Sequence, residues 1–71
     1  MKRNDLLQLI AEAARERGIG WEFVREGGDH EIWTLDGQRV AIPRHREVHE
    51  LTAGRIIKEL ESRLGKQWWR R

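Results

Sequence analysis

Histidine is the side chain in this sequence best suited to proton transfer, and three are present, at positions 30, 45 and 49. Neutral imidazole can accept or donate a proton near neutral pH, because its unperturbed pKa is about 6.5. The chain has no cysteine, and its one serine, Ser62, falls inside a predicted helix without a partner base. No GxGxxG or GxxxxGK(S/T) pattern is present to cradle a nucleotide phosphate. Any catalysis by this chain would therefore depend on a histidine.

His30 stands in the stretch GGDHEIW, directly after a glycine-rich turn and at the start of a predicted strand. RNA cleavage is a reaction that one histidine can support, because the ribose 2′-hydroxyl is itself the nucleophile and needs only a base to take its proton. Gly27 and Gly28 would form a tight turn with little side-chain bulk, which lets an RNA backbone approach closely. The residues alone leave two interpretations open: a reactive histidine, or an ordinary strand residue beside a turn.

The other two histidines lie in a basic stretch, PRHREVHEL, that has no clear periodicity. His45 and His49 are four residues apart, which allows a metal site, but no HExxH pattern and no third ligand are evident. Arg44, His45 and Arg46 could instead reach for phosphate oxygens, or form a solvated turn. Arginine provides 11 of the 14 basic residues, against 12 acidic ones. Because its planar guanidinium binds phosphate bidentately, this bias favours nucleic acid or an acidic protein as partner.

Two amphipathic helices and three short strands are predicted to position these side chains. Apolar residues at three- and four-residue spacing predict a helix over residues 4–17, capped by Asn4 and ended by Gly18. A second helix is predicted from Thr52, as its cap, to Gly65. Strands are predicted over residues 21–26, 30–35 and 38–42, with Asp36-Gly37 as a two-residue hairpin turn.

The basic aromatic tail, residues 65–71, contains Trp68 and Trp69. We expect both to fold back over apolar surface, because a chain of 71 residues buries little without them. The competing interpretation is a stacking platform for bases, with Arg70 and Arg71 beside it.

The order of elements is α-β-β-β-α, which predicts an α+β fold. In it two helices cover one face of a three-stranded antiparallel sheet. The same order occurs in double-stranded-RNA-binding domains, and residues 1–71 are expected to form one domain. No apolar run approaches the roughly 20 residues that a membrane span needs, so no membrane role is predicted. The absence of cysteine is compatible with a cytoplasmic location.

The motifs GGDHEIW and DGQRVAIPRHREV, followed by a helix with a threonine at its start, resemble the HicA family of bacterial toxins. The resemblance runs from the first helix to Leu64. It implies a fold like that of double-stranded-RNA-binding domains, and an endoribonuclease that cleaves mRNA and blocks translation. It further implies that neither a metal nor a cofactor is used, that the location is the bacterial cytoplasm, and that a HicB-type antitoxin is the silencing partner.

On this resemblance His30 is the catalytic residue. The expected phosphate-binding residues are Arg44, His45 and Arg46, with Arg25 and Arg39 as further candidates. Family members commonly have Gly-Ser-His where this chain has Gly28-Asp29-His30, so Asp29 places a carboxylate beside the expected catalytic group. The alternative function is a non-catalytic RNA-binding module of the same fold.

Overall fold

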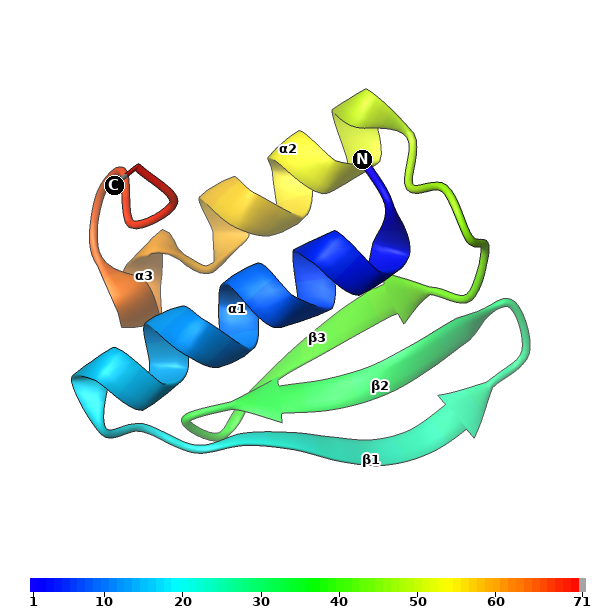
Figure 1. Cartoon of the computed structure of the whole chain (residues 1–71). Helices are drawn as coiled ribbons and strands as arrows, with labels where there is room; N and C mark the ends of the chain where they lie inside the picture. The colour runs from blue at the N-terminus through cyan, green and yellow to red at the C-terminus, as the bar shows by residue number, and fades with distance from the viewer. Residues whose placement is uncertain (71) are drawn as a thin grey trace.

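The helices of this protein lie on one face of a three-stranded sheet, as the computed structural model shows for residues 1–70 (Figure 1). The order is α1 (Arg3–Arg17), β1 (Trp21–Gly27), β2 (His30–Leu35), β3 (Gln38–Pro43), α2 (Glu50–Glu59) and α3 (Glu61–Leu64). The sheet is antiparallel throughout, with strand order β1-β2-β3. This arrangement confirms the predicted α+β fold and is consistent with that of a double-stranded-RNA-binding domain.

Helix α1 follows the predicted apolar stripe, because Leu6, Ile10, Ala13 and Ala14 are all buried. It ends as predicted at Gly18, whose φ of 67° is in the left-handed region that glycine adopts without a steric penalty. The predicted Asn4 cap is wrong: the helix begins at Arg3, and its N-cap, Lys2, makes no side-chain cap. A distant backbone group takes over part of that role, since the Arg3 N–H donates to the carbonyl of Arg46 at 2.8 Å.

The strands begin where predicted, and two tight turns connect them. Asp36 and Gly37 both have positive φ, at 50° and 84°, as a type I′ hairpin turn requires. In the other turn Gly28 has a φ of 63°. A break in register between Phe23 and Arg25 marks a β-bulge in β1.

The second predicted helix is divided in two. Helix α2 begins at Glu50, so the predicted Thr52 cap is wrong; the cap is His49, whose Nδ1 accepts a hydrogen bond from the Leu51 N–H at 3.2 Å. After a break at Leu60, α3 continues the apolar stripe with Leu64, and Gly65 is its C-cap, which is where the helix was predicted to end. The segment 44–49 is irregular, as expected, but it is not wholly superficial, since Val48 is buried.

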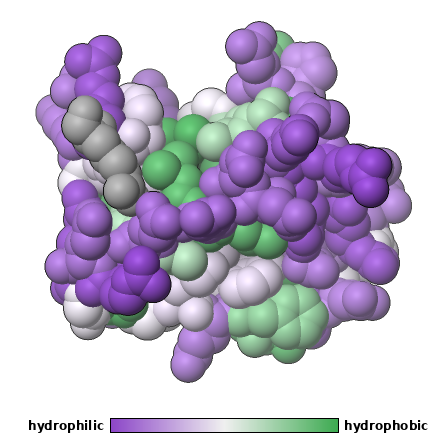
Figure 2. Space-filling model, viewed as in Figure 1, coloured by the Kyte–Doolittle hydropathy of each residue, from purple (hydrophilic) through white to green (hydrophobic). Residues whose placement is uncertain are grey.

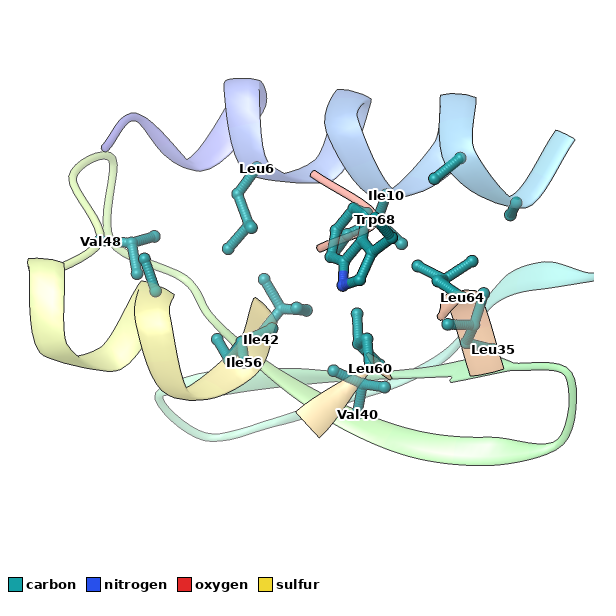
Figure 3. Packing of buried hydrophobic residues seen from close by; sticks show 13 residues of the cluster. Leu6, Ile10, Leu35, Val40, Ile42, Val48, Ile56, Leu60, Leu64 and Trp68 are labelled. Atoms are coloured by element: carbon teal, nitrogen blue, oxygen red, sulfur yellow. The ribbon is translucent and has the colours of Figure 1, made fainter. Parts of the chain in front are cut away.

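The core lies between the helices and the sheet (Figure 3). It joins α1 and the α2–α3 pair to the inward-facing residues Leu35, Val40 and Ile42. Trp68 lies in the same cluster with 5% of its surface exposed, and its Nε1 donates to the Ile57 carbonyl at 2.9 Å. The expectation that Trp68 packs against the core is confirmed. Trp69 is partly buried against the cluster, and Arg71 lies outside the described residues.

Hydrophilic side chains cover most of the face seen in Figure 2, with apolar areas between them. Within residues 1–70, no helix is long and apolar enough to cross a membrane. The sheet pairing nevertheless leaves Phe23 and Val24 of the edge strand about half exposed, at 50% and 45%.

Candidate nucleic-acid site

His30 is the first residue of β2, beside the tight turn that joins β1 to β2. It pairs with Gly27 on one side and with Pro43, the last residue of β3, on the other. Side chains alternate along a strand, so Glu31, Trp33 and Leu35 face the helices and His30 belongs to the opposite set. Its side chain is exposed, at a corner of the sheet that lies close to the start of α2.

Two cavities share His30, and they also share Pro43, Thr52 and Arg55. One has a volume of about 350 Å³ and extends along α2 to Glu59. The other, of about 310 Å³, extends towards the segment 44–49. We call the two together the histidine groove. It has room for a nucleotide, and its lining includes three histidines, His30, His45 and His49, and one arginine, Arg55.

Arg55 and Thr52 are the residues that sequence reasoning missed at this site. Both lie on α2, three residues apart, and therefore on one face of the helix. Their spacing beside the apolar stripe was visible in the sequence. What the sequence did not show is that this face of α2 would lie against the end of β3, next to His30.

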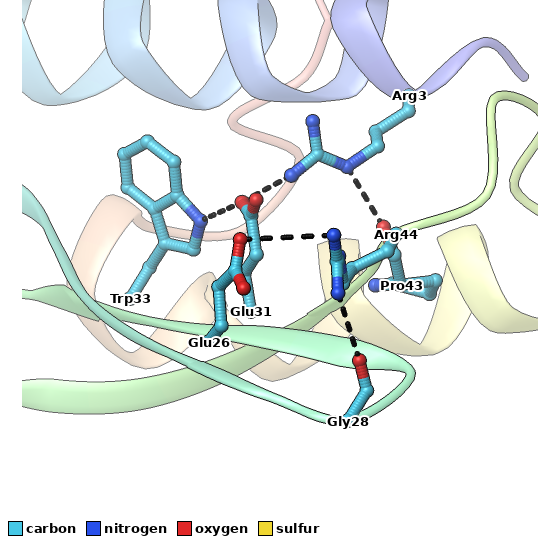
Figure 4. Close-up of polar contacts among 7 residues, drawn as sticks. All are labelled: Arg3, Glu26, Gly28, Glu31, Trp33, Pro43 and Arg44. Carbon is cyan, nitrogen blue, oxygen red and sulfur yellow. Dashed lines mark hydrogen bonds and ion pairs between the residues drawn. The ribbon is translucent and has the colours of Figure 1, made fainter.

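Arg44 supports the turn beside His30 (Figure 4). Its backbone N–H donates to the carbonyl of Asp29 at 3.0 Å, and its Nη1 donates to the carbonyl of Gly28 at 3.3 Å. Its Nη2 also lies 3.6 Å from the Glu26 carboxylate. Arg44 thus holds the Gly28-Asp29 turn from the side of the segment 44–49.

Arg3 ties the start of α1 to the same end of the sheet (Figure 4). Its Nε donates to the carbonyl of Pro43 at 2.8 Å, and its Nη2 is paired with Glu31. The Glu31 carboxylate also accepts from Trp33 Nε1 at 3.0 Å. These contacts fix the ends of β2 and β3, and with them the position of His30.

The expected phosphate-binding residues do not all gather around His30. His45 lines the histidine groove, whereas Arg44 and Arg46 line a separate cavity with residues from the start of α1. Arg25 and Arg39 belong to strand positions on the sheet face opposite the helices, because they pair with Ile32 and Thr34. The Arg25 guanidinium lies over Gly27, where Nη1 would be 3.2 Å from a Cβ added to that glycine.

The predicted turn residues are close to His30, and the two glycines differ in their surroundings. At Gly27 an added Cβ would lie 3.2 Å from Arg25 Nη1, so the exposed guanidinium would have to move slightly. At Gly28 there is open space, but the positive φ of 63° is one that other residues rarely adopt.

The spacing of His45 and His49 in the sequence also makes them candidate ligands of a metal ion. Among residues 1–70, no three His, Cys, Asp or Glu side chains lie close enough together to hold a metal ion. His49 has the structural task of capping α2.

The structure thus combines an α+β fold, consistent with that of a double-stranded-RNA-binding domain, with an exposed histidine at the sheet corner. Comparison with family models then identifies the family: the model described as "HicA toxin of bacterial toxin-antitoxin" matches residues 11–61. The chain belongs to this family of toxins, and membership implies an antitoxin partner. No curated protein and no solved structure gives a significant match. The matched range includes His30, Thr52 and Arg55, and leaves out Lys2, Arg3 and the C-terminal tail.

Proposed function

We propose that this protein is an endoribonuclease toxin that cleaves mRNA without a metal ion and so blocks translation. Its substrate is single-stranded RNA lying in the histidine groove, and His30 is its catalytic residue. The observation that carries the proposal is the position of His30: exposed, beside a glycine turn, and sharing its cavities with Arg55.

In the proposed reaction His30 takes the proton of a ribose 2′-hydroxyl. The 2′-oxygen then bonds to the adjacent phosphorus, and the bond from phosphorus to the 5′-oxygen breaks. The leaving 5′-oxygen receives a proton from water and the His30 imidazolium returns its proton to the solvent, so the products are a 2′,3′-cyclic phosphate and a 5′-hydroxyl end. Arg55 is the cation common to both cavities of the groove, and its guanidinium stabilises the negative charge that develops on the phosphoryl oxygens.

Arginine content and groove shape both support RNA as the substrate class. The groove is open to solvent along the side of α2, as a linear polymer requires, and it contains no deep enclosed pocket for a small metabolite. We place the protein in the bacterial cytoplasm, where mRNA is found, as one domain over residues 1–71. A HicB-type antitoxin would silence it by covering the groove.

A non-catalytic RNA-binding module is the second candidate, and one observation favours it. Within residues 1–70 the His30 imidazole has no hydrogen-bond partner to orient it, whereas a catalytic base is usually held by a third group. Catalytic contacts often form only once substrate is bound, so this geometry keeps both candidates open to a direct test.

The test compares cleavage of a labelled single-stranded RNA by the protein and by His30→Ala, both in EDTA. The protein is expected to cut and to leave 2′,3′-cyclic phosphate ends, while His30→Ala binds the RNA without cutting it. His49→Asn is the matched control, because it removes an imidazole from the same groove but keeps a side chain that caps helices well. Circular dichroism shows whether each variant is folded.

Three outcomes would count against the proposal. If EDTA stops the reaction, a metal ion is required. If His30→Ala still cuts, the catalytic residue is another one. If the protein binds RNA but never cuts it, the non-catalytic module is the correct function.

A further inference from the structure

A second cavity, of about 520 Å³, lies apart from the histidine groove and is lined almost wholly by cations. Lys2, Arg3 and Asn4 come from the start of α1, and Arg44 and Arg46 from the segment after β3. We call it the basic cavity. It shares no lining residue with the two cavities of the histidine groove.

Only half of the positive charge in the basic cavity is balanced within the described part of the chain. Arg3 is paired with Glu31, and Arg44 lies 3.6 Å from Glu26. The side chains of Lys2 and Arg46 have no partner among residues 1–70. Like charges held in one cavity repel each other, and an anion with several oxygens would remove that repulsion.

The two arginines that have partners are also held in place. Arg3 donates through Nε to the Pro43 carbonyl, and its own backbone N–H is bonded to the carbonyl of Arg46. Arg44 is fixed by the carbonyl of Gly28. A guanidinium that is already oriented loses less entropy when it binds an anion, which suits a phosphate group.

The segment 43–46 forms the wall between the two sites. Pro43 and His45 line the histidine groove, while Arg44 and Arg46 line the basic cavity. A polymer that crosses this wall would therefore meet His30 on one side and the free cations on the other. Single-stranded RNA has a phosphate at every nucleotide, so one strand can occupy both sites.

We propose that the basic cavity is a second phosphate-binding subsite, which holds the backbone of the RNA strand outside the two nucleotides that react at His30. The inference rests on the proposed function and goes beyond it by separating binding from chemistry. Lys2 and Arg46 would contact the phosphate directly, and Arg3 and Arg44 would shape the cavity around it.

The test is a double variant, Lys2→Gln with Arg46→Gln, made in the inactive His30→Ala protein. Neither side chain has a partner, so the fold should survive. Its matched control is Arg15→Gln with Lys66→Gln, which removes the same charge from exposed side chains outside both sites. The measurement is the affinity for a fluorescent single-stranded RNA across a salt series. Loss of this one neutralised phosphate should make the salt slope shallower by about 0.7.

With that change in slope, the loss of affinity in the Lys2/Arg46 variant should grow by about 2.6-fold between 200 mM and 50 mM salt. The Arg15/Lys66 control should show no such growth. In the active protein, Lys2→Gln with Arg46→Gln should raise KM for a long RNA and leave kcat unchanged. For a dinucleotide substrate, which fills only the histidine groove, both constants should stay the same.

Equal losses in both double variants would mean that only overall charge matters, and the subsite would be refuted. Unchanged RNA affinity with weakened antitoxin binding would make the cavity a protein-docking site instead. Because affinity is measured in the inactive background, a failure here is distinct from a failure of the proposed cleavage. If no variant binds RNA, the subsite is refuted directly.

Discussion

Trp68 joins the C-terminal tail to the core, and truncating it to alanine is expected to remove most of the stability of this domain. Its indole is 95% buried in the cluster between the helices and the sheet (5% exposed). Replacing a buried tryptophan by alanine typically lowers the free energy of unfolding by about 3 to 5 kcal/mol. A domain of 71 residues has a free energy of unfolding on the order of 4 to 10 kcal/mol, so the Trp68→Ala variant would keep only a small part of that stability.

Trp68 also stabilises the domain through a hydrogen bond, and a second variant measures that contribution separately. Trp68 Nε1 donates to the carbonyl of Ile57, in the last turn of α2, where carbonyls lack a partner within the helix. Trp68→Phe keeps most of the ring but removes the donor, so it should cost about 1 to 3 kcal/mol. Trp69→Ala, at a partly buried position, should cost less than Trp68→Ala.

The assay is urea unfolding followed by circular dichroism, with RNA affinity measured on the folded fraction. Since about 1 kcal/mol corresponds to 4 to 8 °C in a domain of this size, Trp68→Ala should also melt more than about 12 °C lower. Truncation after Leu64 should likewise lower the melting temperature more than it weakens RNA binding. A stable Trp68→Ala protein with poor RNA affinity would refute this reasoning and support the base-stacking interpretation of the tail.

Two further predictions concern the histidine groove. Arg55→Gln should lower kcat by about 100-fold with little change in RNA affinity, as removal of one donor to a developing oxyanion does, and equal losses in kcat and affinity would show that Arg55 only binds. Asp29→Ser should increase cleavage at pH 7, with the larger gain at low salt, because Asp29 is among the residues that line the groove and its negative charge lies near where a phosphate must arrive. Rates at two salt concentrations check it, and an unchanged or lower rate would give Asp29 a neutral or positive role.

Local patterns were enough to predict the elements of this fold. The apolar stripes predicted α1 and one helix where the structure has α2 and α3, and Asp36-Gly37 predicted the hairpin that sets the register of β2 and β3. These signals act within a few residues, so a sequence displays them directly. The helix starts were wrong because their causes lie elsewhere: α1 begins where the Arg3 N–H meets the Arg46 carbonyl, a contact across more than 40 residues.

The residues of the candidate site also fall into two groups: those that local sequence predicts and those that only the packing of distant elements brings together. His30 and its glycines are contiguous in sequence, so their geometry could be predicted from turn chemistry. Arg55 comes to His30 only because the apolar stripe of α2 packs on the sheet, with Ile56 beside it in the same cavity. Arg44 and Arg46 looked equivalent to His45 in the sequence. Alternation along the segment 43–46 places them in the basic cavity instead.

That separation changes how the arginines of this chain can contribute to catalysis. A cation stabilises a transition state only where the charge develops, and in the proposed reaction that cation is Arg55, which lines both cavities of the groove. The cations of the proposed subsite in the basic cavity would act on substrate and transition state alike, which strengthens binding without accelerating the chemical step. An enzyme that relies on one catalytic histidine, as proposed for His30, would gain most from the second effect at low RNA concentration. In the proposed reaction, holding the strand at a neighbouring phosphate would keep the 2′-hydroxyl beside His30 for longer, which gives the slow chemical step more time to occur.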